Sequence, residues 1–250
     1  MTGRTLRDFY EDPLVPARSG ADRARRQAEM LAALLPGLPS PARVLDIGCG
    51  DGFATEISAR IAAGGTAGGT VRRESGPRIL GLDWSATSLR AARRRGLTVA
   101  RASLEQAGLP IGSDLIDVVI LGEVIEHLAD TDAAIEEIRR VLRPGGSLLV
   151  STPNLAAWYN RALLAAGIQP VFSEVSLRSV FGRPGSQVAG HLRMFTRRAL
   201  VEFLAAYGLV TVRVTGASYH DLPGPLRPLD RAFCRWPAAA SILLVHARKR

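Results

Sequence analysis

The stretch Val44-Leu45-Asp46-Ile47-Gly48-Cys49-Gly50-Asp51-Gly52 decides the fold class of this chain. Its first part is apolar and rich in β-branched residues, which predicts a buried parallel strand. After the glycines, Phe53, Ile57 and Ile61 recur at helical spacing. The glycines therefore lie where a strand turns into a helix, and a residue without a Cβ lets the backbone turn tightly and a ligand approach it closely. We interpret the stretch as a cofactor-binding turn.

A second apolar strand is predicted by Ile79-Leu80-Gly81-Leu82-Asp83-Trp84-Ser85, ahead of a helical stretch over residues 88–95. In doubly wound folds, an acid about 20 residues beyond the glycine turn hydrogen-bonds the ribose of a nucleotide. Asp83 lies further along the chain than that. The extra length has a cause, because residues 64–77 are rich in glycine, lack periodicity and predict a surface loop. We therefore expect Asp83 to bind a ribose.

Further segments follow in the order found in a known family. They are Leu109-Pro110-Ile111, Ile116-Asp117-Val118-Val119-Ile120, Gly122-Glu123-Val124-Ile125-Glu126-His127-Leu128 and the run from Val141 to Val150. With the two segments above, residues 40–155 resemble class I S-adenosylmethionine-dependent methyltransferases, in the branch of quinone-type and small-molecule methyltransferases. Ser151-Thr152-Pro153-Asn154 and Gly190-His191-Leu192-Arg193-Met194-Phe195-Thr196 look similar to the same group.

The resemblance implies an α/β fold of the Rossmann-like, doubly wound kind. Its sheet would have seven strands, mostly parallel, with an antiparallel C-terminal strand pair and with helices on both faces. Ligands of such sheets bind at the carboxyl ends of the strands, so Leu121, Gly122 and Glu123 are expected to border the same crevice as Gly48 and Asp83.

S-adenosylmethionine is the cofactor that the resemblance implies. Asp46 would hold the α-amino group of its methionine moiety, and Asp83 its ribose hydroxyls. Trp84 would stack on the adenine or, alternatively, fill the core. Relatives often have an acid where Ser103 stands, and a serine hydroxyl accepts a hydrogen bond from the adenine amino group more weakly. The expected cofactor-binding set is Asp46, Gly48, Cys49, Gly50, Gly52, Asp83, Trp84, Ser103, Leu104, Leu121, Gly122 and Glu123.

Two histidines are candidate catalytic residues. His127 follows Glu123 and Glu126 in the helix expected after the fourth strand, and an imidazole beside a carboxylate can act as a base near neutral pH. A structural or cofactor-contacting role for His127 is an equal alternative, because relatives of unlike chemistry share the Glu-His-Leu segment. His191 and Arg193 either face a polar or anionic substrate or form a solvated turn.

We expect one domain over residues 1–250, because 250 residues with 47% hydrophobic content can form one sizeable α/β core. Tyr10 is a candidate lid residue that contacts substrate. Tyr159 belongs to an aromatic group that either shapes the acceptor pocket or forms a separate hydrophobic cluster. The expected parts are an N-terminal helical lid segment (1–40), a cofactor-binding core (41–153), a cap-like insertion (154–190), and a C-terminal helix with the last two strands (191–250).

Composition limits the partners. The net charge is +9, yet Lys249 is the only lysine and the arginines follow an alanine and arginine bias, so we do not expect nucleic acid as a partner. Cys49 and Cys234 are too few for a disulfide framework, which favours a reducing cytoplasm. No leader or long apolar run predicts secretion or a membrane span. No ligand spacing predicts a metal site.

The sequence thus favours a methyltransferase that transfers a methyl group to a small-molecule acceptor, on oxygen rather than on nitrogen or carbon. An RNA methyltransferase is one alternative, although an amino-adenine enzyme would be expected to carry an Asn/Asp-Pro-Pro-aromatic segment where this chain has Gly122-Glu123-Val124-Ile125. A nonenzymatic S-adenosylmethionine-binding subunit is another. A nicotinamide dehydrogenase is a weaker rival, because the glycines are spaced more tightly than in Gly-x-Gly-x-x-Gly.

Overall fold

The computed structural model describes residues 20–64, 76–105, 108–186, 188–219 and 222–250. Tyr10 lies outside these residues, as does most of the glycine-rich loop expected before the second strand. No helix among the described residues is both long and apolar enough to cross a membrane.

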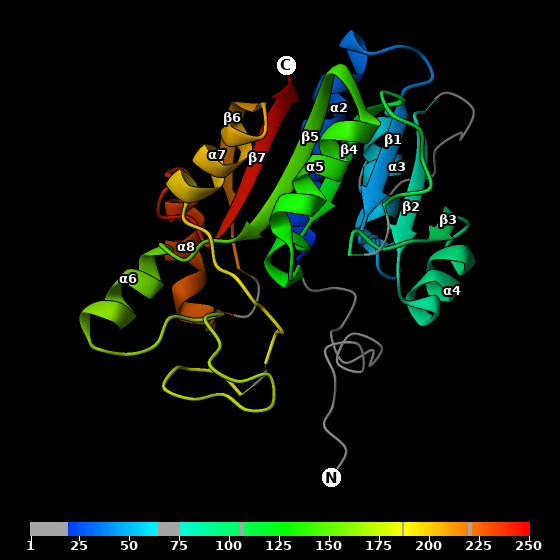
Figure 1. Cartoon of the computed structure of the whole chain (residues 1–250). Coiled ribbons are helices and arrows are strands. Elements are labelled where there is room, and N and C mark those ends of the chain that lie inside the picture. Colours follow the sequence, from blue (N-terminus) through cyan, green and yellow to red (C-terminus); the bar gives the residue numbers. More distant parts are fainter. Residues whose placement is uncertain (1–19, 65–75, 106–107, 187, 220–221) are drawn as a thin grey trace.

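A seven-stranded sheet with the order β3-β2-β1-β4-β5-β7-β6 forms the centre of the molecule (Figure 1). Its strands are parallel except β7, which runs antiparallel to both β5 and β6. This confirms the predicted fold class. The strands are β1 (Arg43–Ile47), β2 (Arg78–Asp83), β3 (Thr98–Arg101), β4 (Ile116–Gly122), β5 (Leu142–Pro153), β6 (Leu209–Ala217) and β7 (Ile242–Lys249).

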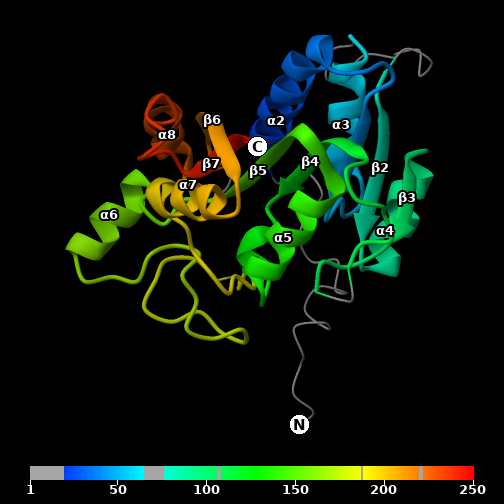
Figure 2. The same cartoon turned by 45° about the horizontal axis from the view of Figure 1, so that its top comes forward.

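Helices cover both faces of the sheet (Figure 2). On one face, Leu31 of α2 packs against Val44 and Ile120. On the other face, Ile135 of α5 and Leu200 of α7 share the main core with Leu45 and its neighbours. The described helices are α2 (Ala21–Leu34), α3 (Phe53–Ala62), α4 (Ala86–Arg94), α5 (Thr131–Val141), α6 (Trp158–Ala165), α7 (Arg197–Ala206) and α8 (Arg227–Phe233), with 3₁₀ turns at η1 (Leu35–Gly37), η3 (Ile125–His127) and η4 (Gly224–Leu226).

Local sequence explains where several helices begin. Ser85, Asp130 and Thr196 each accept a backbone N–H at the start of α4, α5 and α7. Such caps satisfy amides that have no partner inside the helix. The cap at Asp130 fixes the start of α5 well beyond the end of β4.

The segment after β4 differs from the prediction. Glu123 and His127 were expected on a helix, but Glu123 has a left-handed backbone with φ 58° and only the 3₁₀ turn η3 follows it. A left-handed residue interrupts right-handed helix geometry, so the chain cannot continue as an α-helix from this point. The prediction of a helix here is wrong. Glu126 and His127 instead lie in a short turn at the carboxyl end of β4.

Candidate active site

The glycine turn lies at the carboxyl end of β1 and is bonded to β2. Gly48, Gly50 and Gly52 all have positive φ, at 74°, 55° and 83°. The Gly48 and Cys49 amides donate to the Leu82 carbonyl at 2.8 and 3.0 Å. A Cβ on Gly48 would overlap the Val124 side chain, and one on Gly52 would overlap that of Leu97.

Gly50 is different, because a Cβ built on it would meet no atom of the described residues within 4 Å. Packing therefore explains why Gly48 and Gly52 lack side chains. At Gly50 packing gives no such explanation. Glycine is favoured there by the positive φ, and its missing side chain leaves open space beside the backbone. A ligand can approach the main chain closely at this position.

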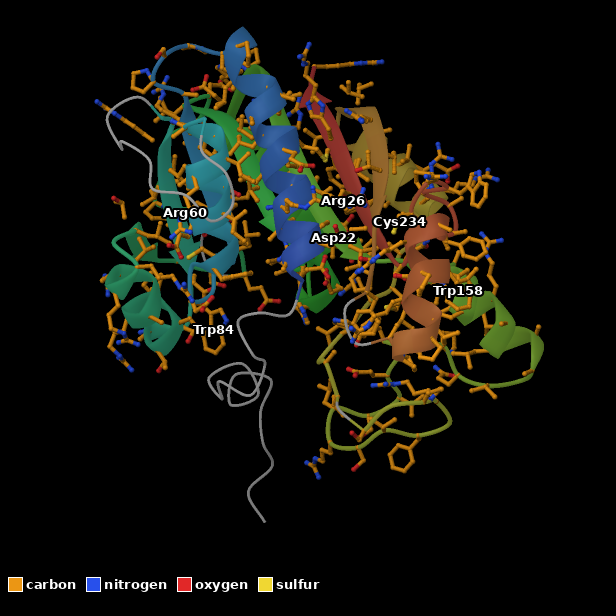
Figure 3. The ribbon with its side chains drawn as sticks, turned by 180° about the vertical axis from the view of Figure 1, so that it is seen from behind. Asp22, Arg26, Arg60, Trp84, Trp158 and Cys234 are labelled. Carbon is orange, nitrogen blue, oxygen red and sulfur yellow. The ribbon has the colours of Figure 1, made fainter. Side chains whose placement is uncertain are left out.

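Asp83 connects the end of β2 to this turn. Its Oδ2 accepts the Gly50 amide at 2.8 Å, and its Oδ1 accepts the Ser85 amide at 2.8 Å. Burial raises the pKa of the Asp83 carboxyl, while these amide bonds act in the opposite direction. Each carboxylate oxygen has a further lone pair that can accept a hydroxyl. The neighbouring Trp84 lies beside α4 in Figure 3.

Asp46 is buried within β1, with 4% of its surface exposed. Its Oδ2 accepts the Thr55 hydroxyl at 2.6 Å. Burial raises the pKa of Asp46 to about 6, although the Thr55 hydrogen bond and the charge of Arg23 lower it. A cation bound nearby would favour the ionised form of this carboxyl.

Arg23 on α2 is a functional candidate that the sequence analysis missed. It is 9% exposed and donates from Nη1 to the Gln27 Oε1 at 3.1 Å. A Cβ on Gly122 would lie 2.7 Å from that Nη1, so the guanidinium lies against the end of β4. Its charge lowers the pKa values of Asp46, Glu123 and Glu126.

A signal for Arg23 exists in the sequence, because Arg23, Gln27 and the buried Leu31 follow one another at four-residue spacing. Residues spaced in this way share one helix face.

Four side chains meet beyond the end of β4, and we call them the acid–histidine cluster: Glu123, Glu126, His127 and His191. One potential ligand atom from each of Glu126, His127 and His191 lies within 4.8 Å of the others. The two imidazole centroids are 4.7 Å apart, and the His127 Nε2 lies 4.0 Å from the Glu126 Oε1. The cluster adjoins the glycine turn, because Val124 packs directly against Gly48.

Several polar atoms of the acid–histidine cluster have no hydrogen-bond partner among the described residues. They are the Glu123 Oε1, the Glu126 Oε1 and the His191 Nδ1, and all three are buried. The other Glu126 oxygen accepts the Thr152 hydroxyl at 2.9 Å. Burying an unsatisfied polar atom costs free energy, so buried polar atoms without a partner call for an explanation. A bound ligand would supply the missing partners.

Burial dominates the electrostatics of the acid–histidine cluster. It raises the pKa values of Glu123 and Glu126, and repulsion from Glu123 raises that of Glu126 further. It lowers the pKa of His127 to about 4 and that of His191 to about 3, so both imidazoles are neutral at pH 7.

The tautomer of His127 follows from its contacts. The His127 Nδ1 lies 3.1 Å from the Gly190 carbonyl oxygen, which can only accept. Nδ1 therefore carries the proton, and Nε2 is the atom with a lone pair that can bind a proton or a metal ion. Spacing along the chain did not reveal this grouping, because His191 comes from a segment distant in sequence.

The remaining predicted substrate residues, Tyr159 and Arg193, contact other parts of the protein. Tyr159 is 7% exposed and packs with Ala157 and Leu222 in a separate hydrophobic cluster. The Arg193 guanidinium donates to the carbonyls of Leu128 at 2.5 Å and Ala129 at 2.7 Å. These contacts give both side chains a structural role, and substrate contact by either stays a prediction.

Two predicted cofactor contacts, Ser103 and Leu104, are also engaged within the protein. The Ser103 hydroxyl accepts the Glu105 amide at 3.1 Å. The Leu104 side chain is buried in the main core, together with Leu121. The role of either residue toward the cofactor stays a prediction.

Comparison with known proteins identifies methyltransferases as relatives of this chain. Residues 20–214 match the model of a methyltransferase domain. The chain is 31% identical to the ubiquinone biosynthesis O-methyltransferase of Chelativorans sp. (strain BNC1) over 72% of its own length and 63% of that relative. It therefore spans less than two thirds of that relative's length.

Two solved structures show the same fold. The methyltransferase in complex with the Trm112 methyltransferase activator from Haloferax volcanii has a TM-score of 0.61, at 17% identity over 97% of this chain and 96% of that one. The 1,6-didemethyltoxoflavin-N1-methyltransferase of Burkholderia thailandensis, with S-adenosylhomocysteine bound, has a TM-score of 0.54, at 20% identity over 92% and 79%.

Proposed function

This chain belongs to the class I S-adenosylmethionine-dependent methyltransferases, and from that premise we propose that it methylates a hydroxyl group of a small molecule. In this reaction the methyl group leaves the sulfonium of S-adenosylmethionine and forms a bond to the acceptor oxygen. The acceptor loses its hydroxyl proton, and S-adenosylhomocysteine is the second product. The family membership accounts for the cofactor, whereas the acceptor and the choice of oxygen are our proposal.

The observation that carries the proposal is the acid–histidine cluster. Transfer to a hydroxyl is faster when a group near the reacting atoms takes its proton or lowers its pKa. The cluster provides two neutral imidazoles and the buried carboxyl group of Glu126 beside the glycine turn. An amine acceptor would have less need of such groups, because its lone pair is available once it is deprotonated.

Residues of the glycine turn are proposed to hold the cofactor. Asp83 would accept the ribose hydroxyls, and the open main chain at Gly50 would border the bound molecule. Arg23, whose guanidinium lies against Gly122 at the end of β4, would attract the methionine carboxylate, while Asp46 would attract the α-amino group. Together these groups orient the sulfonium toward the acceptor.

A divalent metal ion fits the acid–histidine cluster. Imidazole nitrogens and carboxylate oxygens are ligands for several such ions, and Glu126, His127 and His191 each bring one such atom within 4.8 Å of the others. The Glu126 Oε1 and the His191 Nδ1 are buried and have no hydrogen-bond partner among the described residues. When bound, the ion would lower the pKa of a coordinated hydroxyl. Thr152 holds the Glu126 carboxylate, and the Gly190 carbonyl fixes the His127 tautomer. Without an ion, His127 Nε2 would itself accept the hydroxyl proton.

The first test measures cofactor binding and turnover. We expect S-adenosylmethionine, but not NAD, to quench tryptophan fluorescence saturably, with calorimetry as a second readout. An acceptor screen of phenols, catechols and primary amines would then follow S-adenosylhomocysteine formation. Methylation of amines but not hydroxyls would overturn the proposal. Turnover with EDTA, and again after adding Mg²⁺ or Co²⁺, separates the metal-assisted route from the histidine base.

Asp83→Ala is expected to weaken S-adenosylhomocysteine binding by at least about 1.5 kcal/mol, the scale of a hydrogen bond to a charged group. Titration calorimetry measures the change. Asp132→Ala is the matched control, since Asp132 lies in the first turn of α5 and its carboxylate accepts the Tyr207 hydroxyl. Unchanged affinity in Asp83→Ala would remove Asp83 from the cofactor site.

A further inference from the structure

The segment between α6 and α7 contains a buried ion pair. The side chains of Glu174 and Arg183 are 2% and 5% exposed, and the Arg183 Nη2 lies 2.9 Å from the Glu174 Oε1. Apolar side chains of the same segment point into solvent instead, with Val175 67% and Phe181 58% exposed. The Glu174–Arg183 pair is therefore one of the contacts that hold this segment, together with the packing of the Phe172 ring against His191.

The Glu174 carboxylate also accepts three consecutive backbone amides. Its Oε1 accepts the Ala189 amide at 2.5 Å, and its Oε2 accepts those of Gly190 at 2.7 Å and His191 at 3.0 Å. Hydrogen bonds to an ionised acceptor are stronger than those between neutral groups. One side chain thus fixes the main chain at 189–191.

The main chain held by Glu174 carries parts of the acid–histidine cluster. His191 contributes its imidazole, and the Gly190 carbonyl accepts the His127 Nδ1 proton. The next two amides along the chain, those of Leu192 and Arg193, donate to the Glu126 carbonyl at 2.8 and 3.1 Å. The segment that contains His191 is therefore hydrogen-bonded both to the Glu174 side chain and to the 3₁₀ turn that contains Glu126.

We propose that Glu174 is a positioning residue, whose carboxylate holds residues 189–191 so that both imidazoles face Glu126. Removing a buried charge that pairs with several donors is costly, and buried ion pairs seldom add net stability over apolar residues. A positioning role explains why this pair lies next to the cluster. The positioning role rests on the proposed function in one respect: that function is what assigns proton or metal binding to the two imidazoles.

The test compares Glu174→Gln with Glu202→Gln, which removes an exposed carboxylate paired with Arg198 on α7. Hydrogen exchange of the amides at 189–191 is measured first. We expect exchange at least about tenfold faster in Glu174→Gln alone. Co²⁺ titration followed by absorption is measured second, and we expect about 10- to 100-fold weaker binding, the range found when groups that orient metal ligands are lost.

Two further variants keep the proposal falsifiable if Glu174→Gln does not fold. Glu174→Asp retains the charge and is expected to recover part of the exchange protection. Arg183→Gln leaves the three amide bonds in place and is expected to change exchange at 189–191 less than Glu174→Asp does. The proposal would be overturned if Glu174→Asp and Arg183→Gln lowered the free energy of unfolding equally and left amide exchange at 189–191 unchanged. The ion pair would then only stabilise the segment between α6 and α7.

Failure of the proposed function gives a different result. If the wild-type protein binds no Co²⁺, the metal-assisted route is lost, but amide exchange and the imidazole NMR signals of His127 and His191 still report on Glu174. Unchanged exchange and imidazole shifts in Glu174→Gln would overturn the positioning role whether or not the metal binds.

Discussion

Turnover of a hydroxyl acceptor is expected to fall at least about a hundredfold in His127→Ala, while affinity for S-adenosylhomocysteine stays within about twofold of wild type. The reason is that His127 Nε2 lies 4.0 Å from the buried Glu126 Oε1 and has the lone pair to which we assign the chemistry, whereas the glycine turn and Asp83 are the residues proposed to hold the cofactor. Steady-state kinetics and calorimetry measure the two effects separately.

His191→Ala is expected to cause a loss of similar size. The double variant should lose little more than either single one, because groups that act as a unit are not additive. His246→Gln is the control, since His246 lies on β7 with its Nε2 3.0 Å from the Ser147 hydroxyl. Equal losses of turnover and cofactor affinity in His127→Ala would make His127 a binding residue and exclude its role as a base or metal ligand.

Gly52→Ala is expected mainly to lower the free energy of unfolding, whereas Gly50→Ala is expected mainly to lower the affinity for S-adenosylhomocysteine. In Gly52→Ala the new Cβ overlaps Leu97 and lies 3.2 Å from the Ala92 Cα, at a residue with φ 83°. We expect the free energy of unfolding to fall by about 2–4 kcal/mol, from backbone strain together with overpacking. Urea denaturation of the protein without cofactor measures this loss.

Gly50→Ala adds a methyl group where no described atom lies within 4 Å, so only the φ of 55° opposes it. The unfolding free energy should fall by only about 1–2 kcal/mol, the cost of a left-handed residue with a Cβ. Affinity for S-adenosylhomocysteine should fall about 10- to 100-fold, because a methyl group crowding a bound ligand costs about 1–3 kcal/mol. Wild-type affinity in Gly50→Ala would show that the cofactor does not lie against this glycine.

The sequence was sufficient for the fold and for the glycine turn. The glycine turn is marked by features that are adjacent in the chain: an apolar strand, three glycines and a helical repeat. They can therefore be recognised without knowledge of the tertiary contacts. The carboxylate at the end of β2 was equally visible, because strand ends of parallel sheets meet at one edge. The structure agrees, with Asp83 bonded to the Gly50 amide.

The turn after β4 could not be predicted in the same way. Its acids and His127 follow an apolar strand with a spacing compatible with a helix, but the left-handed backbone of Glu123 prevents one. That conformation depends on bonds to distant segments, such as the Glu123 amide donating to the Ser151 carbonyl at 3.0 Å. Helical spacing in the sequence carries no information about such a bond.

By itself, then, the sequence determined the doubly wound sheet, the glycine turn after β1 and the identity of the carboxylate at the end of β2. Only the tertiary structure decided that Arg23 lies against Gly122 and that His191 joins Glu126 and His127. The physical reason is that strand and helix periodicity and the steric needs of glycine act between neighbours along the chain. Burial of charge acts between whichever segments the fold brings together, and its effect on these side chains exists only once that packing has formed.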